Sequence, residues 1–221
     1  MGGKEAGTLS LGAQLLLEMR EDIIGGRLLP GTALVEGELV KAYNASRNSI
    51  REALHQLDRE GLATYVRHKG VMVRRLGLAE VRDIFQVRRT LELQAILTSR
   101  PLREYQSDRM LDALEAAELA QSREDWRALG THSLHFHQHI VGLLRSPLFD
   151  EFFATVAAQM RLLFSLAPDE EHFQRPWIAR DRQLHDLLAA GHRQVAGEAM
   201  ASYLDDSENR LLDLLSAARP L

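Results

Sequence analysis

Four histidines lie within eight residues of the chain, at His132, His135, His137 and His139. Imidazole binds divalent metals and exchanges protons near neutral pH, so this cluster suggests a metal site or an acid–base site. On a helix, three of these histidines share one face, whereas His137 lies on the face directed to the core. His135 and His139 have the i, i+4 spacing of a metal-binding pair. Phe136 follows His135, however, so the H-E-x-x-H pattern of a zinc protease is missing.

Two arginines stand at the start of a predicted helix, where positive charge is least favourable. Arg47 and Arg51 lie one turn apart, directly after Ser46, which is a good N-terminal capping residue. Their charges oppose the positive end of the helix dipole, at a cost of a few tenths to about 1 kcal/mol. The arrangement suits a polyanion, because N–H groups at a helix start hold phosphate and an arginine fork bridges O6 and N7 of guanine.

The segments around these arginines have the order of a winged helix-turn-helix. Apolar residues recur at helical spacing over residues 10–24, 35–43 and 46–60. Two short β-prone runs follow at 62–67 and 71–75, separated by the basic tip His68-Lys69-Gly70. The sequence therefore predicts a DNA-binding domain over residues 10–75, preceded by a disordered tail at 1–9.

The rest of the chain lacks strand signals and predicts an all-α domain. Apolar residues recur at helical spacing over 80–99, 106–121, 125–145, 148–166, 176–190 and 193–217. Proline and glycine residues separate these stretches. We therefore expect a linker at 76–80 and a bundle of about six helices over 81–221, which makes the protein mostly α.

The net charge of −4 conceals a division between the two predicted domains. Residues 1–75 contain 11 Lys and Arg against 9 Asp and Glu, whereas residues 76–221 contain 16 against 22. A local basic surface matters more for DNA binding than the charge of the whole chain. The chain contains no cysteine, no apolar run of the roughly 18 residues that a membrane span needs, and no signal-peptide pattern. These features fit a cytoplasmic protein without a membrane partner.

The first of the two predicted domains resembles the DNA-binding domain of GntR-family transcription regulators. The matching motifs are G-x-L-x-P-G at 26–31, S-R-x-x-I-R-E-A-L at 46–54 and L-x-x-E-G-L at 57–62. The resemblance implies that DNA meets Ser46, Arg47, Asn48, Ser49 and Arg51 of the recognition helix and Arg67, His68, Lys69 and Gly70 of a wing that reaches the minor groove. The family commonly has Thr-Pro where this chain has Asn48-Ser49, and some members have an arginine where it has Gly37. The operator is therefore expected to differ from the usual family sites.

The second domain resembles the FCD effector domain of the FadR-type branch, in its six-helix VanR form. The residues that carry this resemblance are V-R-R-T-L-E at 87–92, L-H-F-H-Q-H-I at 134–140 and R-Q-L-H-D-L-L-A-A-G at 182–191. Many FCD domains bind a divalent metal. The resemblance places the ligand positions on Ser133, His137, Asp181 and Tyr203, with His185 as an alternative if the alignment shifts by a turn.

Of the four expected metal ligands, this chain has only one, His137, and Asp181 is a possible substitute for another. Hydroxyl groups are poor ligands for Zn or Ni compared with imidazole and carboxylate. We therefore expect Ser133, His137, Asp181 and Tyr203 to hold an organic effector by hydrogen bonds and to bind no metal. If a metal is bound, His137 and Asp181 are its ligands.

Two arginines in otherwise apolar helical stretches, Arg88 and Arg161, are candidates for binding the carboxylate of an effector. A buried guanidinium needs such a partner, because an unpaired buried charge is costly. Each arginine is equally well explained by an internal salt bridge or by a side chain whose charged end reaches solvent.

The leading interpretation is a transcription repressor that binds a palindromic operator as a homodimer and responds to a small carboxylate metabolite. Its two recognition helices would lie about one helical turn of DNA apart. One alternative is a DNA-binding protein without a ligand, which predicts a steep dependence on salt and little dependence on sequence. Another is a small-acid enzyme using His137, Asp181 and Tyr203. Against an enzyme, the chain has no G-x-S-x-G motif, no P-loop, no Rossmann fingerprint and no cysteine.

Overall fold

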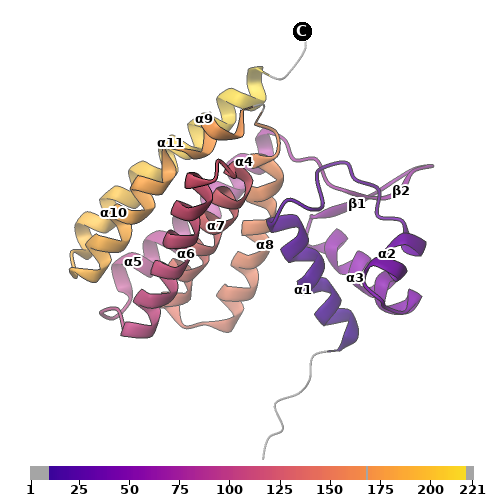
Figure 1. The fold of residues 1–221 in the computed structure, drawn as a ribbon, viewed down its shortest axis with the longest axis horizontal. Coiled ribbons are helices and arrows are strands. Elements are labelled where there is room, and N and C mark those ends of the chain that lie inside the picture. The colour runs from indigo at the N-terminus through magenta and orange to yellow at the C-terminus, as the bar shows by residue number, and fades with distance from the viewer. Residues whose placement is uncertain (1–9, 168, 218–221) are drawn as a thin grey trace, which may run out of the picture.

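The computed structural model describes residues 10–167 and 169–217, which form two domains along the chain (Figure 1). The N-terminal domain contains helices and a hairpin, and the described part of the helical domain that follows contains helices alone. This order confirms the predicted winged helix-turn-helix followed by an all-α bundle. The predicted tail at 1–9 lies outside the described residues.

The helices of the N-terminal domain are α1 (Leu11–Ile24), α2 (Glu36–Ala42) and α3 (Arg47–Arg59). The Ser10 side chain accepts the N–H of Ala13 at 3.1 Å and caps the start of α1. Gly26 follows the end of α1 with a φ of 68°, a left-handed conformation that favours glycine. The apolar faces of these helices meet in a core that includes Met19, Ile50 and Leu57, all fully buried.

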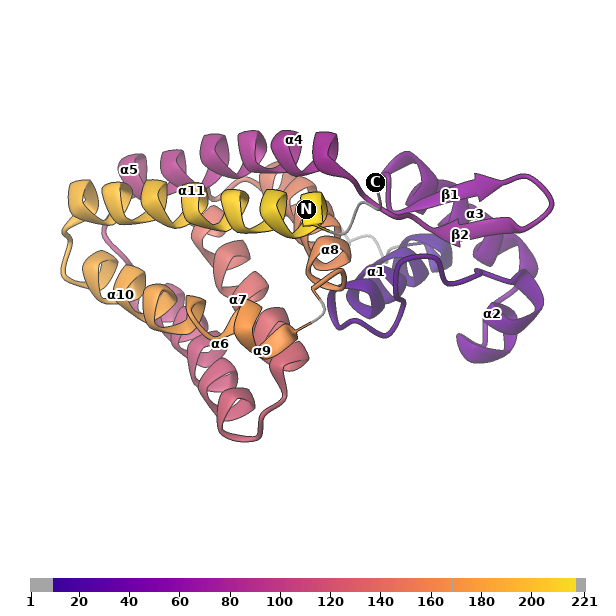
Figure 2. The ribbon, with the colours of Figure 1, turned by 90° about the horizontal axis from the view of Figure 1, so that it is seen from above.

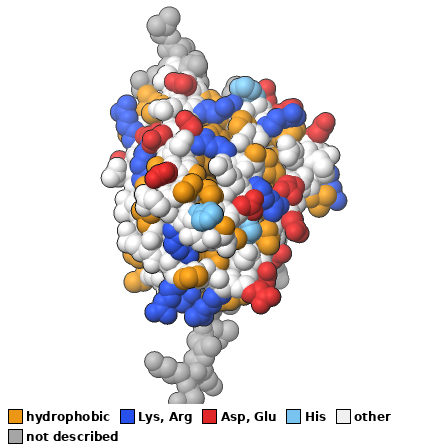
Figure 3. Space-filling model, turned by 90° about the vertical axis from the view of Figure 1, so that its left-hand side faces the viewer, with side chains coloured by type: hydrophobic (Ala, Val, Ile, Leu, Met, Phe, Trp, Pro, Cys, Tyr) orange, Lys and Arg blue, Asp and Glu red, His pale blue; other side chains and the backbone are white. Residues whose placement is uncertain are grey.

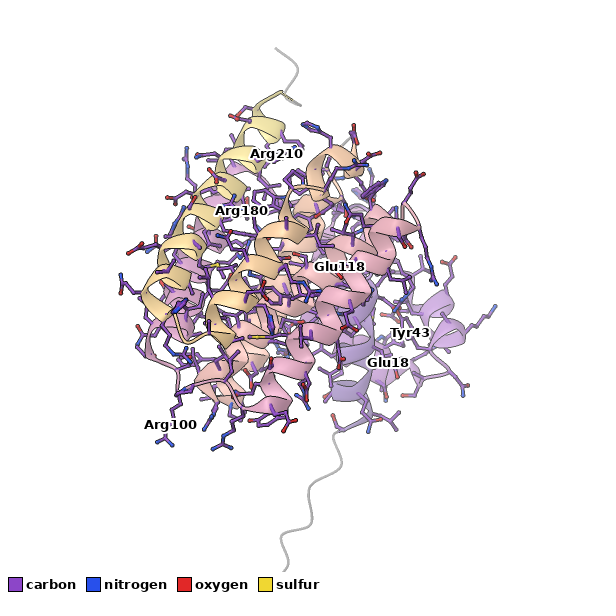
Figure 4. The ribbon with its side chains drawn as sticks, turned by 60° about the vertical axis from the view of Figure 1, so that its left-hand side comes forward. Glu18, Tyr43, Arg100, Glu118, Arg180 and Arg210 are labelled. Carbon is purple, nitrogen blue, oxygen red and sulfur yellow. The ribbon has the colours of Figure 1, made fainter. Side chains whose placement is uncertain are left out.

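Two polar contacts fix α2 and α3 relative to α1. The buried Arg20 side chain of α1 donates through Nε and Nη2 to Glu60, directly after α3, at 3.2 and 2.7 Å. The Tyr43 hydroxyl, at the end of α2, donates to Asp22 of α1 at 2.5 Å (Figure 4). The orientation of α3 is therefore set by packing and by a buried ion pair together.

The hairpin pairs β1 (Ala63–Val66) with β2 (Gly70–Val73) in antiparallel register, with Ala63 opposite Val73 and Val66 opposite Gly70. Its turn uses left-handed φ values of 67° at His68 and 80° at Gly70. The strands are shorter than the predicted runs at 62–67 and 71–75, because their outer residues belong to the turn and the flanking loops. The hairpin itself is confirmed.

The helical domain contains ten helical segments in its described part. They are α4 (Leu78–Arg88), η1 (Arg89–Leu93), α5 (Gln94–Thr98), α6 (Glu104–Ser122), α7 (Trp126–Val141), η2 (Gly142–Leu144), α8 (Pro147–Phe164), α9 (Glu170–Gln174), α10 (Trp177–Ala189) and α11 (Arg193–Ala217). Segments α4, η1 and α5 continue one another, so the six predicted helices are present. The short α9 is additional. Because α4 begins at Leu78, the last three residues of the predicted linker at 76–80 are helical.

The first helix of this domain contains one wide turn. Segment η1 is a π-helix, a form that is rare and often found at functional sites. Arg88 lies directly before it and Glu92 lies within it, and their side chains are only 2% and 0% exposed. The wide turn therefore carries a buried pair of opposite charges.

Helix α1 connects the two domains into one packed unit. It packs against α3 on one side and against α8 of the helical domain on the other (Figures 1 and 2). Ile23 and Ile24 of α1 belong to the same hydrophobic core as Val156 and Met160 of α8. Hydrogen bonds that cross the junction run from Thr131 to the Ile24 carbonyl (3.0 Å), from Gln159 to the Glu60 carbonyl (2.8 Å) and from Arg127 to the Gly26 carbonyl (3.4 Å).

The outer surface of the helical domain carries charges of both signs. On its side facing away from the N-terminal domain, acidic and basic side chains are interspersed (Figure 3). Over residues 10–167 and 169–217, no helix is long and apolar enough to cross a membrane.

Candidate functional site

The start of α3 presents polar side chains away from the core of the N-terminal domain. Ser46, Arg47 and Asn48 are exposed and Ser49 is half-buried, whereas Ile50 points inward and is fully buried. The Ser46 hydroxyl accepts the N–H of Ser49 at 3.1 Å, so Ser46 caps the helix as predicted. Among the described residues Arg47 forms no ion pair, and its charge is free to meet an anion.

Arg51 is held by a neighbour that the sequence analysis did not identify. Its Nε donates to both carboxylate oxygens of Glu36, the first residue of α2, at 3.0 Å. This hydrogen-bonded pairing raises the pKa of Arg51. The pair lines a hollow of about 350 Å³ between α2, α3 and the hairpin, with His55 and Tyr65 among its other lining residues. Any anion that binds Arg51 must therefore compete with Glu36.

The hairpin flanks α3 and its tip is basic. Arg67, His68 and Lys69 are exposed, and Gly70 is half-buried at the start of β2. Arg74, further along the chain, instead donates to Glu80 of α4 at 2.6 Å. The positive charge of the wing is therefore carried by Arg67 and Lys69 at its tip.

Five of the six predicted effector residues meet inside the helical domain. They are Arg88 of α4, Ser133 and His137 of α7, Asp181 of α10 and Tyr203 of α11, none of them more than 6% exposed. The Ser133 hydroxyl donates to Asp181 Oδ2 at 2.7 Å. The Tyr203 ring lies 4.9 Å from the His137 ring, centroid to centroid. Residues far apart in the sequence thus form one buried polar cluster.

Glu92 completes this cluster and was missed from the sequence. Arg88 Nε donates to Glu92 Oε1 at 2.6 Å, and Glu92 Oε2 lies 2.5 Å from His137 Nδ1. Arg88 Nη2 also lies 3.2 Å from His137 Nδ1. Arg88 and Glu92 are spaced i, i+4 in an apolar helical stretch, and this spacing could have indicated an ion pair between them. The charge of Arg88 is therefore already balanced by an internal carboxylate.

The mutual contacts of these residues shift their protonation equilibria. Burial opposes ionisation of Glu92, but the charges of Arg88 and His137 outweigh it, so the pKa of Glu92 is lowered. Burial and Arg88 disfavour the protonated form of His137, yet Glu92 and Asp181 prevail and raise its pKa. Burial, reinforced by Asp181, raises the pKa of Tyr203 well above its ordinary value. The cluster thus favours an ionised Glu92 and a protonated His137.

Arg161, the sixth predicted effector residue, lies apart from this cluster. It belongs to α8 and sits at the junction of the two domains, where its Nη1 donates to the carbonyl of Arg127 at 3.2 Å. Its Nη2 lies 3.9 Å from Glu170 Oε1. Arg88 and Arg161, which occupy similar apolar stretches of the sequence, therefore lie in different parts of the structure.

The buried cluster is a poor site for a divalent metal. Both oxygens of Glu92 and Nδ1 of His137 are engaged with one another and with Arg88. The unpartnered atoms are His137 Nε2 and Asp181 Oδ1, which lie 3.5 Å apart. Two protein ligands are fewer than the three or four of ordinary zinc sites. Among the described residues, no three His, Asp or Glu side chains are arranged to hold a metal ion.

The remaining histidines of the four-histidine segment do not join this cluster. His135 Nε2 lies 3.5 Å from Glu21 of α1, across the domain junction. Burial lowers the pKa of both His132 and His139. The His132 and His135 rings pack edge to face with centroids 6.2 Å apart, so His137 alone of the four histidines belongs to the buried cluster.

Comparison with known proteins agrees with the order of the two domains. Residues 11–73 match the family model described as bacterial regulatory proteins, gntR family, and residues 83–206 match the FCD domain. An HTH-type transcriptional regulator from an unstable DNA locus of Streptomyces ambofaciens is 27% identical over 203 residues, which cover 86% of this chain and 80% of that protein. The HTH-type transcriptional repressor GlaR of Escherichia coli is 29% identical over 159 residues, covering 66% of this chain and 70% of that protein.

A solved structure agrees with the fold of the whole chain. A protein of Rhodococcus sp. RHA1, described as a transcriptional regulator of the GntR type, shares 30% identity with a TM-score of 0.84. The match covers 96% of this chain and 100% of that one. A helix-turn-helix domain joined to an effector domain makes the protein a ligand-modulated, DNA-binding regulator and not an enzyme. The chain belongs to the GntR family of bacterial regulatory proteins and carries an FCD domain.

Proposed function

We propose that the protein is a cytoplasmic repressor that binds a palindromic operator in double-stranded DNA as a homodimer. The observation that carries this proposal is the start of α3, where Arg47 and Asn48 are exposed beside the basic hairpin tip. In a helix-turn-helix, residues at this position contact base edges in the major groove, and a dimer reads two half-sites about one helical turn apart. The relative GlaR is named a repressor, which supports the sign of regulation.

Selection of binding sites from random duplexes, followed by fluorescence anisotropy, tests this proposal. We expect an inverted repeat to be enriched and Arg47→Ala to weaken binding to it by about 5- to 150-fold, the range for losing a bidentate base contact. Lys69→Ala in the wing is the matched control. It is expected to weaken binding to all duplexes alike and to reduce the salt dependence.

Two outcomes would overturn the specific-binding proposal. One is that no sequence is enriched over random duplex. The other is that Arg47→Ala and Lys69→Ala weaken binding equally on every duplex, which is the behaviour of a sequence-indifferent DNA-binding protein. Light scattering of the complex with the selected duplex tests the dimer, because a mass equal to one chain per duplex contradicts it.

We also propose that the helical domain binds a small organic carboxylate and holds no metal ion. Glu92 pairs with Arg88 through one oxygen and contacts His137 Nδ1 through the other. These contacts occupy atoms that would otherwise bind a metal, which supports its absence. Elemental analysis of protein purified without chelators tests this, and stoichiometric zinc or nickel would contradict it. A thermal-shift screen of small carboxylates tests the effector class, since a ligand that binds the folded protein raises its melting temperature.

A further inference from the structure

Arg161 differs from the other buried arginines because part of its guanidinium has no partner. Its side chain is 1% exposed, and its Nη1 donates to the carbonyl of Arg127 at 3.2 Å. Its Nε and Nη2 have no hydrogen-bond partner among the described residues. Buried donors without partners are costly and rare in native proteins. Two nitrogen atoms of this guanidinium, Nε and Nη2, are therefore available as donors to a ligand.

Elsewhere in the protein, the same edge of an arginine binds a carboxylate. The Nε and Nη2 of Arg20 donate to Glu60 at 3.2 and 2.7 Å. Those of Arg89 donate to Asp205 at 3.2 and 2.6 Å. This edge presents a rigid pair of donors that suits the oxygens of a carboxylate or a phosphate. The free edge of Arg161, formed by its Nε and Nη2, is therefore suited to bind an oxyanion.

The carboxylates near Arg161 do not bond its Nε or Nη2. Glu170 Oε1 lies 3.9 Å from Arg161 Nη2 and 4.0 Å from Arg127 Nε, too far for a hydrogen bond to either. Asp125 also acts on Arg161 through its charge, without a hydrogen bond to it. Burial lowers the pKa of Arg161 to about 10, so the side chain remains protonated at neutral pH. Arg161 is thus a buried, protonated side chain whose Nε and Nη2 are bonded to no anion, although Glu170 and Asp125 lie within range of its charge.

The free edge of Arg161 faces the end of α1. A Cβ atom at Gly26 would lie 2.8 Å from Arg161 Nη2 and 3.2 Å from Arg161 Nε, so glycine is required for this close approach. The Gly26 carbonyl accepts from Arg127 Nη1 at 3.4 Å. An oxyanion that binds Nε and Nη2 of Arg161 must therefore displace Gly26, together with the end of the helix that supports α3.

We propose that the domain junction contains an oxyanion site, in which Arg161 and Arg127 bind the carboxylate or phosphate group of the effector and Gly26 moves away. This inference rests on the ligand-responsive function proposed above and gives the effector's anionic group a position at the junction. In the buried cluster Arg88 is already neutralised by Glu92, which leaves Arg161 as the better receptor for a negative charge.

Inorganic phosphate and acetate, added at constant ionic strength against chloride, are the probes for this site. Their binding is read from the melting temperature of the full-length wild type, Arg161→Met and Arg182→Met. We expect the wild type and Arg182→Met to gain roughly 3–6 °C at a tenfold excess of the better anion over its Kd, and Arg161→Met to gain nothing. Arg182→Met is the matched control, because Arg182 forms a solvent-exposed ion pair with Glu118 in the same domain.

The displacement of Gly26 is measured separately. Because the chain contains no cysteine, cysteines introduced at the exposed Glu38 and Ser122 place one spin label in each domain. We expect the anion to change the distance between the labels in the wild-type background and to leave it unchanged in the Arg161→Met background.

Each remaining outcome overturns part of the proposal. If neither anion stabilises the wild type, or if Arg161→Met responds as the wild type does, the site is refuted. If the anion binds without changing the label distance, the displacement of Gly26 is refuted. Binding of the selected operator is measured on the same samples without anion, so failure of the junction site is distinguishable from failure of DNA binding.

Discussion

Removing the charge of Glu92 should destabilise the folded protein severely. The substitution Glu92→Gln keeps the shape of the side chain but leaves Arg88, 2% exposed, without a carboxylate in contact. Breaking one side of a buried ion pair costs about 3–5 kcal/mol, because the remaining charge stays desolvated. A protein of this size has about 5–15 kcal/mol of stability, so the melting temperature should fall by roughly 6–20 °C.

The assay is urea unfolding followed by circular dichroism, with two comparisons. In an Arg88→Met background, Glu92→Gln should cost much less, because no buried guanidinium is left unpaired. On the surface, Glu118→Gln removes the partner of Arg182, whose side chain is 31% exposed, and should cost at most about 1 kcal/mol. A cost below about 1 kcal/mol for Glu92→Gln, or the same cost in both backgrounds, would refute the reasoning that the pair is desolvated and coupled.

Three further predictions concern the DNA-binding surface and the junction. Glu36→Gln should release Arg51 and strengthen binding to DNA at low salt by about two- to fivefold in anisotropy; weaker binding would show that Glu36 instead orients Arg51 for DNA. Gly70→Val should destabilise the wing by about 1–3 kcal/mol, measured by urea unfolding, because a φ of 80° strains a β-branched residue. Arg161→Met should stabilise the protein at pH 7 by on the order of 3 kcal/mol, because burial of the charged guanidinium is unfavourable and lowers its pKa. Since the folded-state pKa of Arg161 is lowered to about 10 from 12.5, this advantage should shrink as the pH rises through 10; an advantage independent of pH contradicts a buried, protonated Arg161.

The parts of the fold predicted correctly were those with local signals. Ser46 marks the start of α3 and Gly61, with a φ of 67°, follows its end, and both act within a few residues along the chain. The missed helix α9 is five residues long and mostly polar, so it has no periodic apolar face to recognise.

The functional residues that sequence reasoning missed depend on contacts between distant segments. Arg88 and Arg161 occupy similar apolar stretches of sequence, yet Arg88 bonds Glu92 and Arg161 bonds the backbone carbonyl of Arg127. Glu36 lies 15 residues before Arg51, a separation without a fixed geometry until the turn between α2 and α3 is formed. The pairing of charges is therefore a property of tertiary structure, whereas helix ends are a property of the local sequence.

The junction can transmit an effector signal because few interactions need to change there. A tenfold change in DNA affinity corresponds to about 1.4 kcal/mol of coupling free energy between the two sites. The bonds from Thr131 to Ile24 and from Gln159 to Glu60, at 3.0 and 2.8 Å, would be disturbed when the end of α1 moves. Each is worth about 0.5–1.5 kcal/mol, so the loss of one or two bonds in one arrangement of the domains supplies the required difference.

The packing of α1 against both domains determines how an effector would change operator affinity. Because α1 packs on both α3 and α8, its end cannot move relative to α8 without changing the position of α3, and hence the spacing of the two recognition helices in a dimer. An effector lowers operator affinity only if it binds more tightly to the displaced arrangement. The free edge of Arg161 provides that preference, since it is covered by Gly26 in one arrangement and open to an oxyanion in the other.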